Sequence, residues 1–482
     1  LWIAESQMMK ETEDVVHMSL DFLPLRSYAN ITEGNALRLD WESVVPKHQL
    51  SYIMGNPPFV GYSLQSKEQK KDILSIYVNE KGKPYKTAGK IDYVAGWYFK
   101  ASQLIQGTNI RIAFVSTNSI TQGEQVAGVW KPLYDRFGIH IDFAYRTFRW
   151  DSEANLKAHV HCVIVGFSVA PNNAEKRIYS EEHFQMAENI NAYLMDAPTV
   201  FIESRSKSLC EVPEMLYGNK PTDGGFLFLT NDEYQDVQKR EPEILKYIRR
   251  VYGASEFINN KPRFCIWLVG VSPAEVRKSK FIMERVESVR KFRLASTKAA
   301  TRKSAEMPTL FQEVRHPNSD YIIVPRHSSE TRKYIPLGFV SPEIIVNDAV
   351  QIIPNATTYH FGVLTSNVHM AWMRAVCGRI KSDYRYSKDI VYNNFPWPTP
   401  TEEQKTKIEQ TAQGILDARA LYTDCSLADL YDEVTMPVEL RRAHQANDKA
   451  VMAAYGFPVR TTTEASCVAE LMRMYQRLVE GK

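Results

Sequence analysis

The sequence predicts an α/β protein that begins with a doubly wound sheet and continues with a mixed α+β domain and a small helical bundle. Three observations predict this order. Short apolar runs alternate with helical patterns up to about residue 170, irregular aromatic-rich and Pro/Gly-rich segments follow, and helical periodicity dominates after residue 400. Because 482 residues are more than one hydrophobic core usually serves, we expect three domains, at residues 1–170, 190–400 and 401–482.

The first domain contains apolar runs that are typical of strands and one apolar helical segment. We expect strands at 50–54, 110–115 and 160–165 and a helix at 93–104. Strands separated by crossover helices imply a largely parallel sheet, and ligands of such sheets bind at the carboxyl ends of the strands. The residues that follow each strand are therefore the first candidates for a functional site. The fold is expected to be incomplete, because Leu1–Glu5 already has the pattern of an amphipathic helix inside a domain.

The boundary near residue 400 has a clear local cause. The stretch Phe395–Pro400 holds three prolines and can continue neither a helix nor a central strand. Thr401-Glu402-Glu403 then has the pattern of a helix start. Helical periodicity over 403–422 and 438–455 predicts the C-terminal bundle.

Composition excludes several classes of protein. Hydrophobic residues make up 44% and charged residues 24% of the chain, as in ordinary globular proteins, and no apolar run approaches the ~20 residues that span a bilayer. The six cysteines are scattered without ligand spacing, so we expect neither a metal site nor a disulfide framework. A reducing, cytoplasmic location fits best. The net charge of +3 is too small to prove a polyanionic partner.

The strongest local signal is a stiff loop directly after the first predicted strand, made of Asn56, Pro57, Pro58 and Phe59. Two prolines fix the backbone, so the carbonyl groups of Asn56 and Pro57 can point at one spot. Such a pair of acceptors can bind both hydrogens of a nucleobase amino group and favour a pyramidal nitrogen that attacks an electrophilic methyl group. Phe59 can stack on a base that has been flipped out of a helix.

The same four residues also have a purely structural interpretation. A Pro-Pro turn can follow a buried strand, with Asn56 capping local amides and Phe59 in the core. Their position at a strand end of a doubly wound domain favours the functional interpretation.

Asn56-Pro57-Pro58-Phe59 resembles the catalytic motif of class I amino-methyltransferases, and a longer resemblance is to the MmeI-like restriction-modification methyltransferases. The segments that carry it run along nearly the whole chain: Leu1–Glu5, Gly34–Leu37, Gly55–Gly61, Asp92–Val94, Phe114–Gly123, Arg146–Trp150 and Tyr392–Pro398. The resemblance implies S-adenosylmethionine as methyl donor, adenine N6 as acceptor, double-stranded DNA as partner, and a target-recognition domain after the methyltransferase domain.

The resemblance also assigns roles to particular residues. Gly34, Asn35 and Ala36 match the strand end that holds the cofactor adenine, and Asp92 matches a segment that borders the cofactor. The stretch 148–161 matches the region that lines the target-base pocket. Each has a plain alternative: a turn at Gly34-Asn35, a helix cap at Asp92, and packing for the side chains within 148–161.

Two features that the family pattern places ahead of the Leu1–Glu5 helix are missing from this sequence. It contains no Gly-x-Gly loop of the kind that lets a backbone approach the cofactor, and the acidic residue for the cofactor ribose is absent as well. We therefore expect this chain to be the C-terminal portion of the enzyme, with the missing N-terminal segment, and in some members an endonuclease domain, lying upstream or supplied by another chain.

Two other functions stay open from the sequence. One is a DNA-binding recognition subunit or inactive remnant that has lost cofactor binding. The other is a methyltransferase of the same fold that modifies an amide or amine of a protein or an RNA.

Three clusters are candidates for DNA contact. The segment 285–303 holds seven basic residues against one acidic residue, which suits a phosphate backbone, although a solvated helix face looks the same. The basic and aromatic segment 374–388 and the segment 325–333 are candidates for contacting base edges, although surface salt bridges can look alike. The selected residues are Arg290, Arg293, Arg302, Lys303, Arg326, Glu330, Arg332, Lys381 and Arg385.

Overall fold

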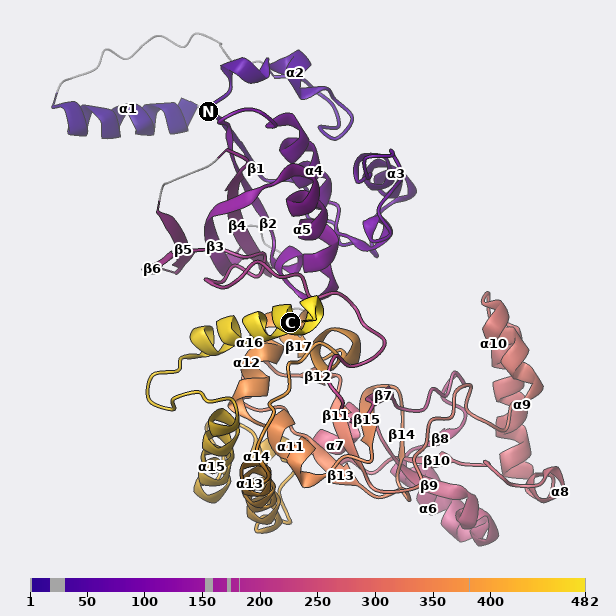
Figure 1. Cartoon of the computed structure of the whole chain (residues 1–482). Helices are drawn as coiled ribbons and strands as arrows, with labels where there is room; N and C mark the ends of the chain where they lie inside the picture. The colour runs from indigo at the N-terminus through magenta and orange to yellow at the C-terminus, as the bar shows by residue number, and fades with distance from the viewer. Residues whose placement is uncertain are drawn as a thin grey trace. The chain divides into compact units, whose positions relative to one another are not determined.

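The computed structural model describes residues 2–17, 31–151, 159–170, 175–181, 183–380 and 382–481. The chain separates into two compact units, residues 1–50 and 51–482 (Figure 1). The first unit contains α1 (Trp2–Val16) and α2 (Trp41–Val44). Among the described helices of both units, none is long and apolar enough to cross a membrane.

The second unit begins with a six-stranded mixed sheet. Its strands are β1 (Tyr52–Gly55), β2 (Arg111–Thr117), β3 (His140–Asp151), β4 (His159–Ser168), β5 (Lys176–Ser180) and β6 (His183–Ala187), in the spatial order β1-β2-β4-β3-β5-β6. The pairs β1/β2 and β3/β5 are parallel, and the other three pairs are antiparallel. The α/β class is confirmed, but the expectation of a largely parallel sheet is wrong. Strands β3 and β4 follow each other as an antiparallel pair, which needs no crossover helix.

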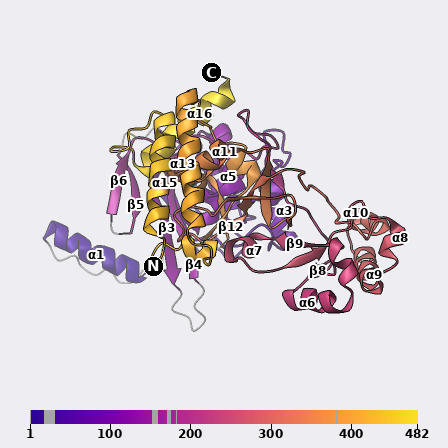
Figure 2. The ribbon, with the colours of Figure 1, turned by 90° about the horizontal axis from the view of Figure 1, so that it is seen from below.

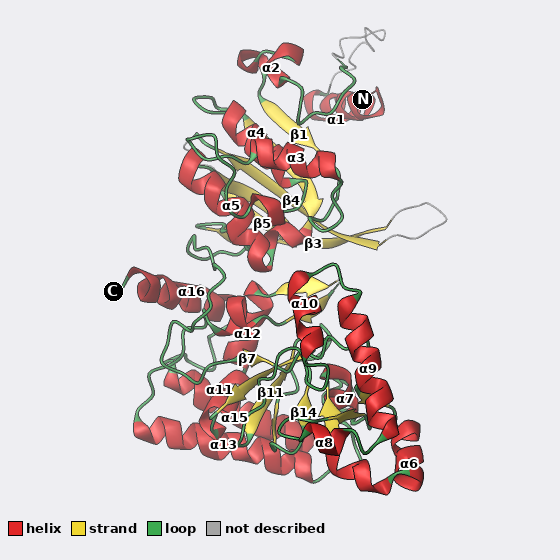
Figure 3. Ribbon diagram, turned by 90° about the vertical axis from the view of Figure 1, so that its right-hand side faces the viewer, coloured by secondary structure: helices red, strands yellow, loops and turns green. Residues whose placement is uncertain are grey.

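Three helices lie on one face of this sheet: α3 (Lys67–Ile76), α4 (Ala95–Leu104) and α5 (Gly123–Phe137) (Figure 3). The fully buried Tyr98 of α4 joins the layers. Its ring lies 5.2 Å from that of Phe114 on β2 and 5.2 Å from that of Trp130 on α5, and its hydroxyl shares a hydrogen bond with Ser116. The helix layer therefore fixes β2 and the loops that follow it.

The region after the six-stranded sheet is mixed α+β, as the sequence predicts. Its sheets have the strand orders β14-β9-β10-β8, β13-β11-β15-β7 and β12-β17-β16. The strands are β7 (Leu216–Tyr217), β8 (Phe228–Leu229), β9 (Ile248–Tyr252), β10 (Phe264–Ile266), β11 (Tyr321–Pro325), β12 (His327–Ser328), β13 (Gly338–Val340), β14 (Ile345–Val346), β15 (Val350–Pro354), β16 (Gly378–Ile380) and β17 (Asp383–Arg385). The helices are α6 (Asn231–Arg240), α7 (Ala254–Asn259), α8 (Pro273–Val276), α9 (Lys280–Leu294), α10 (Ala299–Lys303), α11 (Thr358–Leu364) and α12 (Asn367–Val376).

The last part of the chain is helical, with α13 (Glu402–Ala420), α14 (Leu427–Leu430), α15 (Val438–Ala454) and α16 (Glu464–Glu480) (Figure 2). Thr401 starts α13 as predicted: its hydroxyl accepts a hydrogen bond from the Gln404 amide, and the Gln404 side chain accepts one from the Thr401 amide. Thr411 of α13 donates to the Asn447 side chain of α15, which holds the two long helices together.

Candidate functional site

The Asn56–Phe59 loop leaves the carboxyl end of β1, beside the parallel strand β2. Asn56 and Pro58 are exposed, Phe59 is half-buried, and only Pro57 is buried. The loop therefore presents an amide and an aromatic ring to solvent instead of packing them into the core. The burial pattern does not fit the structural interpretation in which Phe59 is a core residue.

The segment after the loop is held by Asp92 and its neighbour. The Tyr62 amide donates to Asp92 Oδ1 at 2.9 Å, and the Tyr93 amide donates to the Val60 carbonyl at 2.9 Å. The Ser119 hydroxyl, just beyond β2, donates to Asp92 Oδ2 at 2.5 Å. The buried carboxylate thus joins the loops that follow β1 and β2. Its structural role is to hold the segment that follows the Asn56–Phe59 loop.

The end of β2 is also joined to β3. Thr117 and Ser119 share a hydrogen bond of 2.8 Å between their hydroxyl groups. The Asn118 side chain donates to the Thr147 hydroxyl at 3.5 Å. The strand ends after β1 and β2 and the middle of β3 therefore form one connected polar network.

The predicted base-pocket region, 148–161, lies on the ends of β3 and β4. Phe148 is half-buried and its ring lies 6.3 Å from that of Trp150, which is 47% exposed. Residues 152–158 and the side chain of His159 lie outside the described residues. The exposed Trp150 is not a core residue. Contact of the region 148–161 with the target base therefore stays a prediction.

Gly34, Asn35 and Ala36 lie in the first unit, in a turn that precedes α2. The Asn35 carbonyl accepts hydrogen bonds from the amides of Arg38 and Leu39, at 2.8 and 3.0 Å. These residues therefore form a hydrogen-bonded turn, and their contact with a cofactor stays a prediction.

The structure contradicts the prediction that Arg293 contacts DNA. Arg293 is completely buried on α9. Its guanidinium donates five hydrogen bonds of 2.7–3.0 Å to backbone carbonyls, those of Pro221, Thr222, Ser304, Met307 and Leu310. The side chain joins α9 to two segments, 221–222 and 304–310, and has no donor left for a phosphate.

The other candidates of this segment are on the surface. Arg290, Arg302 and Lys303 are exposed. Arg290 lies 3.6 Å from Glu287, and Arg302 on α10 donates to the carbonyls of Ser296 and Thr297 in the turn that precedes this helix. They remain available to a polyanion, and DNA contact stays a prediction for them.

The candidates of the other two clusters lie around the small sheet β12-β17-β16. Arg326 donates to the Asp348 carbonyl at 2.8 Å, and the exposed Arg385 pairs in register with His327. Glu330 lies 3.7 Å from Arg379. Burial lowers the pKa of Arg332, and Lys381 lies outside the described residues.

Two cavities bring parts of this set together with the strand ends. A cavity of about 290 Å³ is lined by Asp92 and Ser119 from one side and by Arg326 and Arg385 from the other. The structure therefore places two predicted DNA contacts in the same cavity as the carboxylate that holds the Asn56–Phe59 loop.

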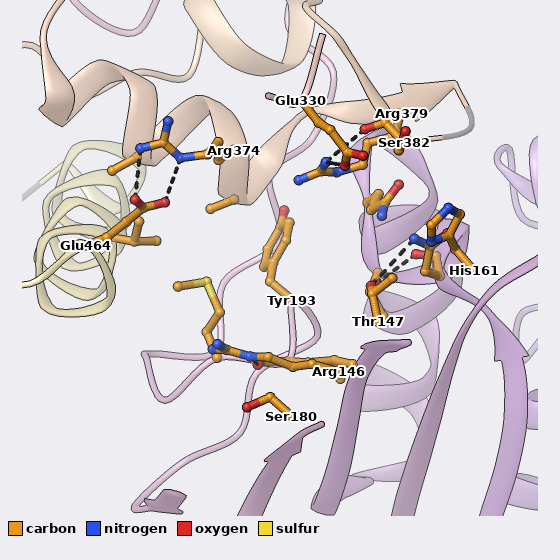
Figure 4. Close-up of a pocket in the computed structure, with 18 of the residues that line it drawn as sticks. Arg146, Thr147, His161, Ser180, Tyr193, Glu330, Arg374, Arg379, Ser382 and Glu464 are labelled. Atoms are coloured by element: carbon orange, nitrogen blue, oxygen red, sulfur yellow. Dashed lines mark hydrogen bonds and ion pairs between the residues drawn. The ribbon is translucent and has the colours of Figure 1, made fainter. Parts of the chain in front are cut away.

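A second cavity, of about 560 Å³, contains Glu330 (Figure 4). Its lining joins β3 and β4 to α12 and β16 through Arg146, His161, Arg374 and Arg379. Arg290, Arg302 and Lys303 line neither cavity.

Sequence reasoning did not select Ser119, Arg146 or Arg379. The first two lie in segments that carry the family resemblance, 114–123 and 146–150, and Arg379 lies in the basic segment 374–388. Their importance depends on partners that are distant in sequence, so only the structure distinguishes them from their neighbours.

Comparison with known proteins adds three domain matches. Residues 1–180 match the family described as "MmeI, DNA-methyltransferase domain", residues 196–399 match "MmeI, target recognition domain", and residues 400–481 match "MmeI, C-terminal domain". Together they cover almost the whole chain, in the order expected from the sequence.

Two relatives match along the full chain. DNA methyltransferase A of Bacillus subtilis (strain 168) is 38% identical over 483 residues, covering 100% of this chain and 54% of that protein. A solved structure of the type IIL restriction-modification enzyme MmeI in complex with DNA is 44% identical with a TM-score of 0.87, covering 100% of this chain and 64% of that one. The chain spans between half and two thirds of the length of these relatives. It belongs to the MmeI-like family of restriction-modification DNA methyltransferases.

Proposed function

We propose that the protein transfers a methyl group to N6 of a flipped-out adenine in double-stranded DNA, as part of a restriction-modification or related defence system in the cytoplasm. The observation that carries the proposal is the exposed Asn56 beside the half-buried Phe59 at the carboxyl end of β1. The match to a target-recognition domain over residues 196–399 favours DNA over a protein or RNA substrate.

The loop residues supply acceptors and a stacking surface. The carbonyl groups of Asn56 and Pro57 accept the two N–H bonds of the adenine amino group, which makes its nitrogen lone pair available for attack. Phe59 stacks on the base and holds it in line. Pro58 stiffens the loop, so that these groups are oriented before the base arrives.

S-adenosylmethionine, when bound, supplies an electrophilic methyl group. The turn at Gly34, Asn35 and Ala36 fits its adenine ring. The Asn35 side chain accepts a hydrogen bond from the Leu37 amide at 2.9 Å, which fixes the turn, and a Cβ at Gly34 would come within 3.1 Å of the Leu39 side chain. Glycine at this position therefore lets the turn pack against Leu39, and the contact with the adenine ring rests on the family resemblance. For Asp92, a cofactor contact is proposed from the family resemblance alone.

DNA binding is proposed for two groups of residues. Exposed Arg290, Arg302 and Lys303 contact phosphates, which gives affinity without sequence information. The proposed base-reading group contains Arg326, Glu330 and Arg385, which line the two cavities. Arg332 and Lys381 are included from the sequence pattern alone, and Lys381 lies outside the described residues. Arginine can bind two acceptors of guanine, and glutamate can accept from cytosine N4.

The proposed division of labour follows the predicted domains. Residues 1–170 carry out methyl transfer, 190–400 recognise the target, and 401–482 support the recognition domain. The three family matches, with their own ranges, support this division.

The acceptor is tested by incubating the purified product of the intact gene, which contains this chain, with tritiated S-adenosylmethionine and a duplex pool, then separating the nucleosides. Label in N6-methyladenine is expected. Label in N4-methylcytosine would keep the reaction and reject the acceptor. If calorimetry shows cofactor and DNA binding but no nucleoside carries label, the proposed reaction is wrong.

A further inference from the structure

Arg146 occupies an unusual position in the 560 Å³ cavity (Figure 4). It lies on β3, four residues before the exposed Trp150, and is half-buried. Its Nε donates to the Leu194 carbonyl at 3.0 Å. Among the described residues no acidic side chain pairs with it. Burial lowers the pKa of the guanidinium, and no neighbouring carboxylate raises it.

The other two arginines that line the cavity are each paired with a carboxylate. Dashed lines in Figure 4 join Arg374 to Glu464 and Arg379 to Glu330. Both Arg374 contacts are short, 2.7 and 2.8 Å, and Arg379 lies 3.7 Å from its partner. Arg146 is therefore the arginine of this cavity whose charge the described chain leaves without a counter-ion. A partly desolvated unpaired charge is costly, so an anion is the expected occupant.

The remaining lining identifies the kind of anion. Uncharged hydroxyl and amide donors line the cavity, namely Asn118, Thr121, Gln122, Thr147, Ser180 and Ser382. The third acid of the lining, Glu181, is exposed. A single charged donor among neutral donors suits a phosphate diester, which carries one charge and two free oxygens.

The cavity also has the right place for DNA. Its walls come from β3 and β4, whose ends form the predicted base-pocket arm, and from α12 and β16 of the target-recognition region. A ligand bound there contacts both functional regions at once. We propose that Arg146 binds a backbone phosphate of the DNA next to the target base. This inference rests on the proposed function, because it requires DNA as the ligand.

A structural role for Arg146 is the competing explanation, since its Nε also holds the segment that contains Leu194. Arg136 on α5 is a matched control. It is half-buried, donates to a backbone carbonyl, that of Val78, and lines neither cavity. Removing either guanidinium loses one carbonyl contact, and removing that of Arg136 also loses its contacts with the rings of Phe99 and Phe137. Only Arg146 should change DNA binding.

The first experiment measures duplex binding by the 482-residue chain with fluorescence anisotropy over a series of salt concentrations. Arg146→Gln should raise Kd about tenfold and reduce the slope of log K against log salt by about one. Arg146→Lys should keep the slope, because it keeps the charge. Arg136→Gln should change neither quantity. An unchanged slope in Arg146→Gln would overturn the proposal.

The second experiment replaces single phosphates near the target base by uncharged methylphosphonates. One position should weaken binding by the unsubstituted chain and have no further effect on Arg146→Gln. If no single position weakens binding by the unsubstituted chain, the proposal is wrong, even if Arg146→Gln does not fold. Absence of any duplex binding by the unsubstituted chain would instead reject DNA as the ligand, and both proposals with it.

Discussion

Asp92 is the residue that holds the end of the Asn56–Phe59 loop, for which we propose the catalytic role. Its two carboxylate oxygens accept from the Tyr62 amide and the Ser119 hydroxyl, so one side chain sets the distance between two strand ends. The proposed base-handling residues, Asn56–Phe59, lie shortly before Tyr62 on the loop that follows β1. A change at Asp92 should therefore alter the orientation of the loop more than the affinity for DNA.

Asp92→Asn should lower kcat about ten- to hundredfold with little change in Kd for DNA, because an amide cannot accept from both donors and a charged hydrogen bond is lost. Ser119→Ala should have a smaller effect in the same direction. Asp135→Asn, which changes an exposed carboxylate on α5, is the control and should be neutral. Single-turnover methyl transfer and anisotropy measure the two quantities. A normal kcat for Asp92→Asn would show that the contact does not position the loop.

Arg293 shows why burial of a charged residue cannot be predicted locally. Its segment has the composition of a phosphate-binding surface, and its five carbonyl partners come from residues 221, 222, 304, 307 and 310. Asn56, by contrast, could be predicted because its motif is contiguous and follows an apolar strand. The position of Asn56 at a strand end could be predicted from its sequence neighbours, and its catalytic role stays a prediction. The prediction for Arg293, whose environment depends on partners in space, was wrong.

Arg293→Met should lower the free energy of unfolding by about 3 kcal/mol or more, because buried carbonyls lose their donors. The exposed Arg290→Met on the same helix should change it by about 0.5 kcal/mol or less. Urea unfolding followed by tryptophan fluorescence compares the two. Equal stability of both variants would mean that the buried contacts do not stabilise the fold.

At the scale of elements, the helices could be predicted better than the strand pairing. The predicted helices at 403–422 and 438–455 correspond to α13 (Glu402–Ala420) and α15 (Val438–Ala454), because caps and periodicity are local. Strand β3 (His140–Asp151) was not predicted, and its antiparallel pairing with β4 makes the sheet mixed. Register between strands depends on contacts that no single segment contains.

The start of α5 makes a close backbone contact with the recognition region. Gly123 has a φ of +53°, and a Cβ there would lie 3.1 Å from Gly378 Cα on β16. Gly138, at the other end of α5, has a φ of +62° and nothing within 4 Å of a Cβ. Substitutions at these two glycines therefore distinguish the cost of backbone strain, present at both, from the cost of a steric clash, present at Gly123 alone.

Gly123→Ala and Gly138→Ala should both cost about 1–2 kcal/mol, because an L side chain is disfavoured at positive φ. Gly123→Ala should lower Tm further and weaken methylation, since it pushes α5 away from β16. Differential scanning calorimetry and a methylation assay give both results. If the two variants behaved alike, the Gly123–Gly378 contact would have no role in joining the regions.

At the scale of the whole molecule, the order of the three regions could be predicted because each has its own composition. The cavities could not be predicted from the sequence. The 560 Å³ cavity combines Asn118, Arg146, Glu330 and Glu464, which lie far apart in sequence. Proximity of this kind results from packing of entire regions and has no local pattern.

Buried histidines make the stability of the whole fold depend on pH. Burial lowers the pKa of His369 to about 3 and that of His360 to about 4, and it holds the pKa of His444 well below its ordinary value. Below about pH 6.5 the unfolded chain binds protons that the folded chain does not. Stability is therefore complete above that pH and is lost progressively as the pH falls toward 4.

Urea midpoints should fall between pH 7 and pH 5. His369→Gln should remove about 1.4 kcal/mol of this loss per pH unit below pH 6, because glutamine does not titrate. The comparison is the slope of stability against pH and not stability at one pH, so a packing defect in the variant does not imitate the effect. An unchanged slope would contradict a neutral, buried His369.

The central claim is that the protein methylates adenine and that the Asn56–Phe59 loop holds the base for this reaction. Mass spectrometry of nucleosides from DNA tests this claim most directly. Methylation-free cells express either the gene that encodes this chain or its Asn56→Ala version, at equal levels of soluble protein. N6-methyladenine is expected with the first and not with the second. N6-methyladenine that persists with Asn56→Ala, or no methylated base with either, would contradict the account.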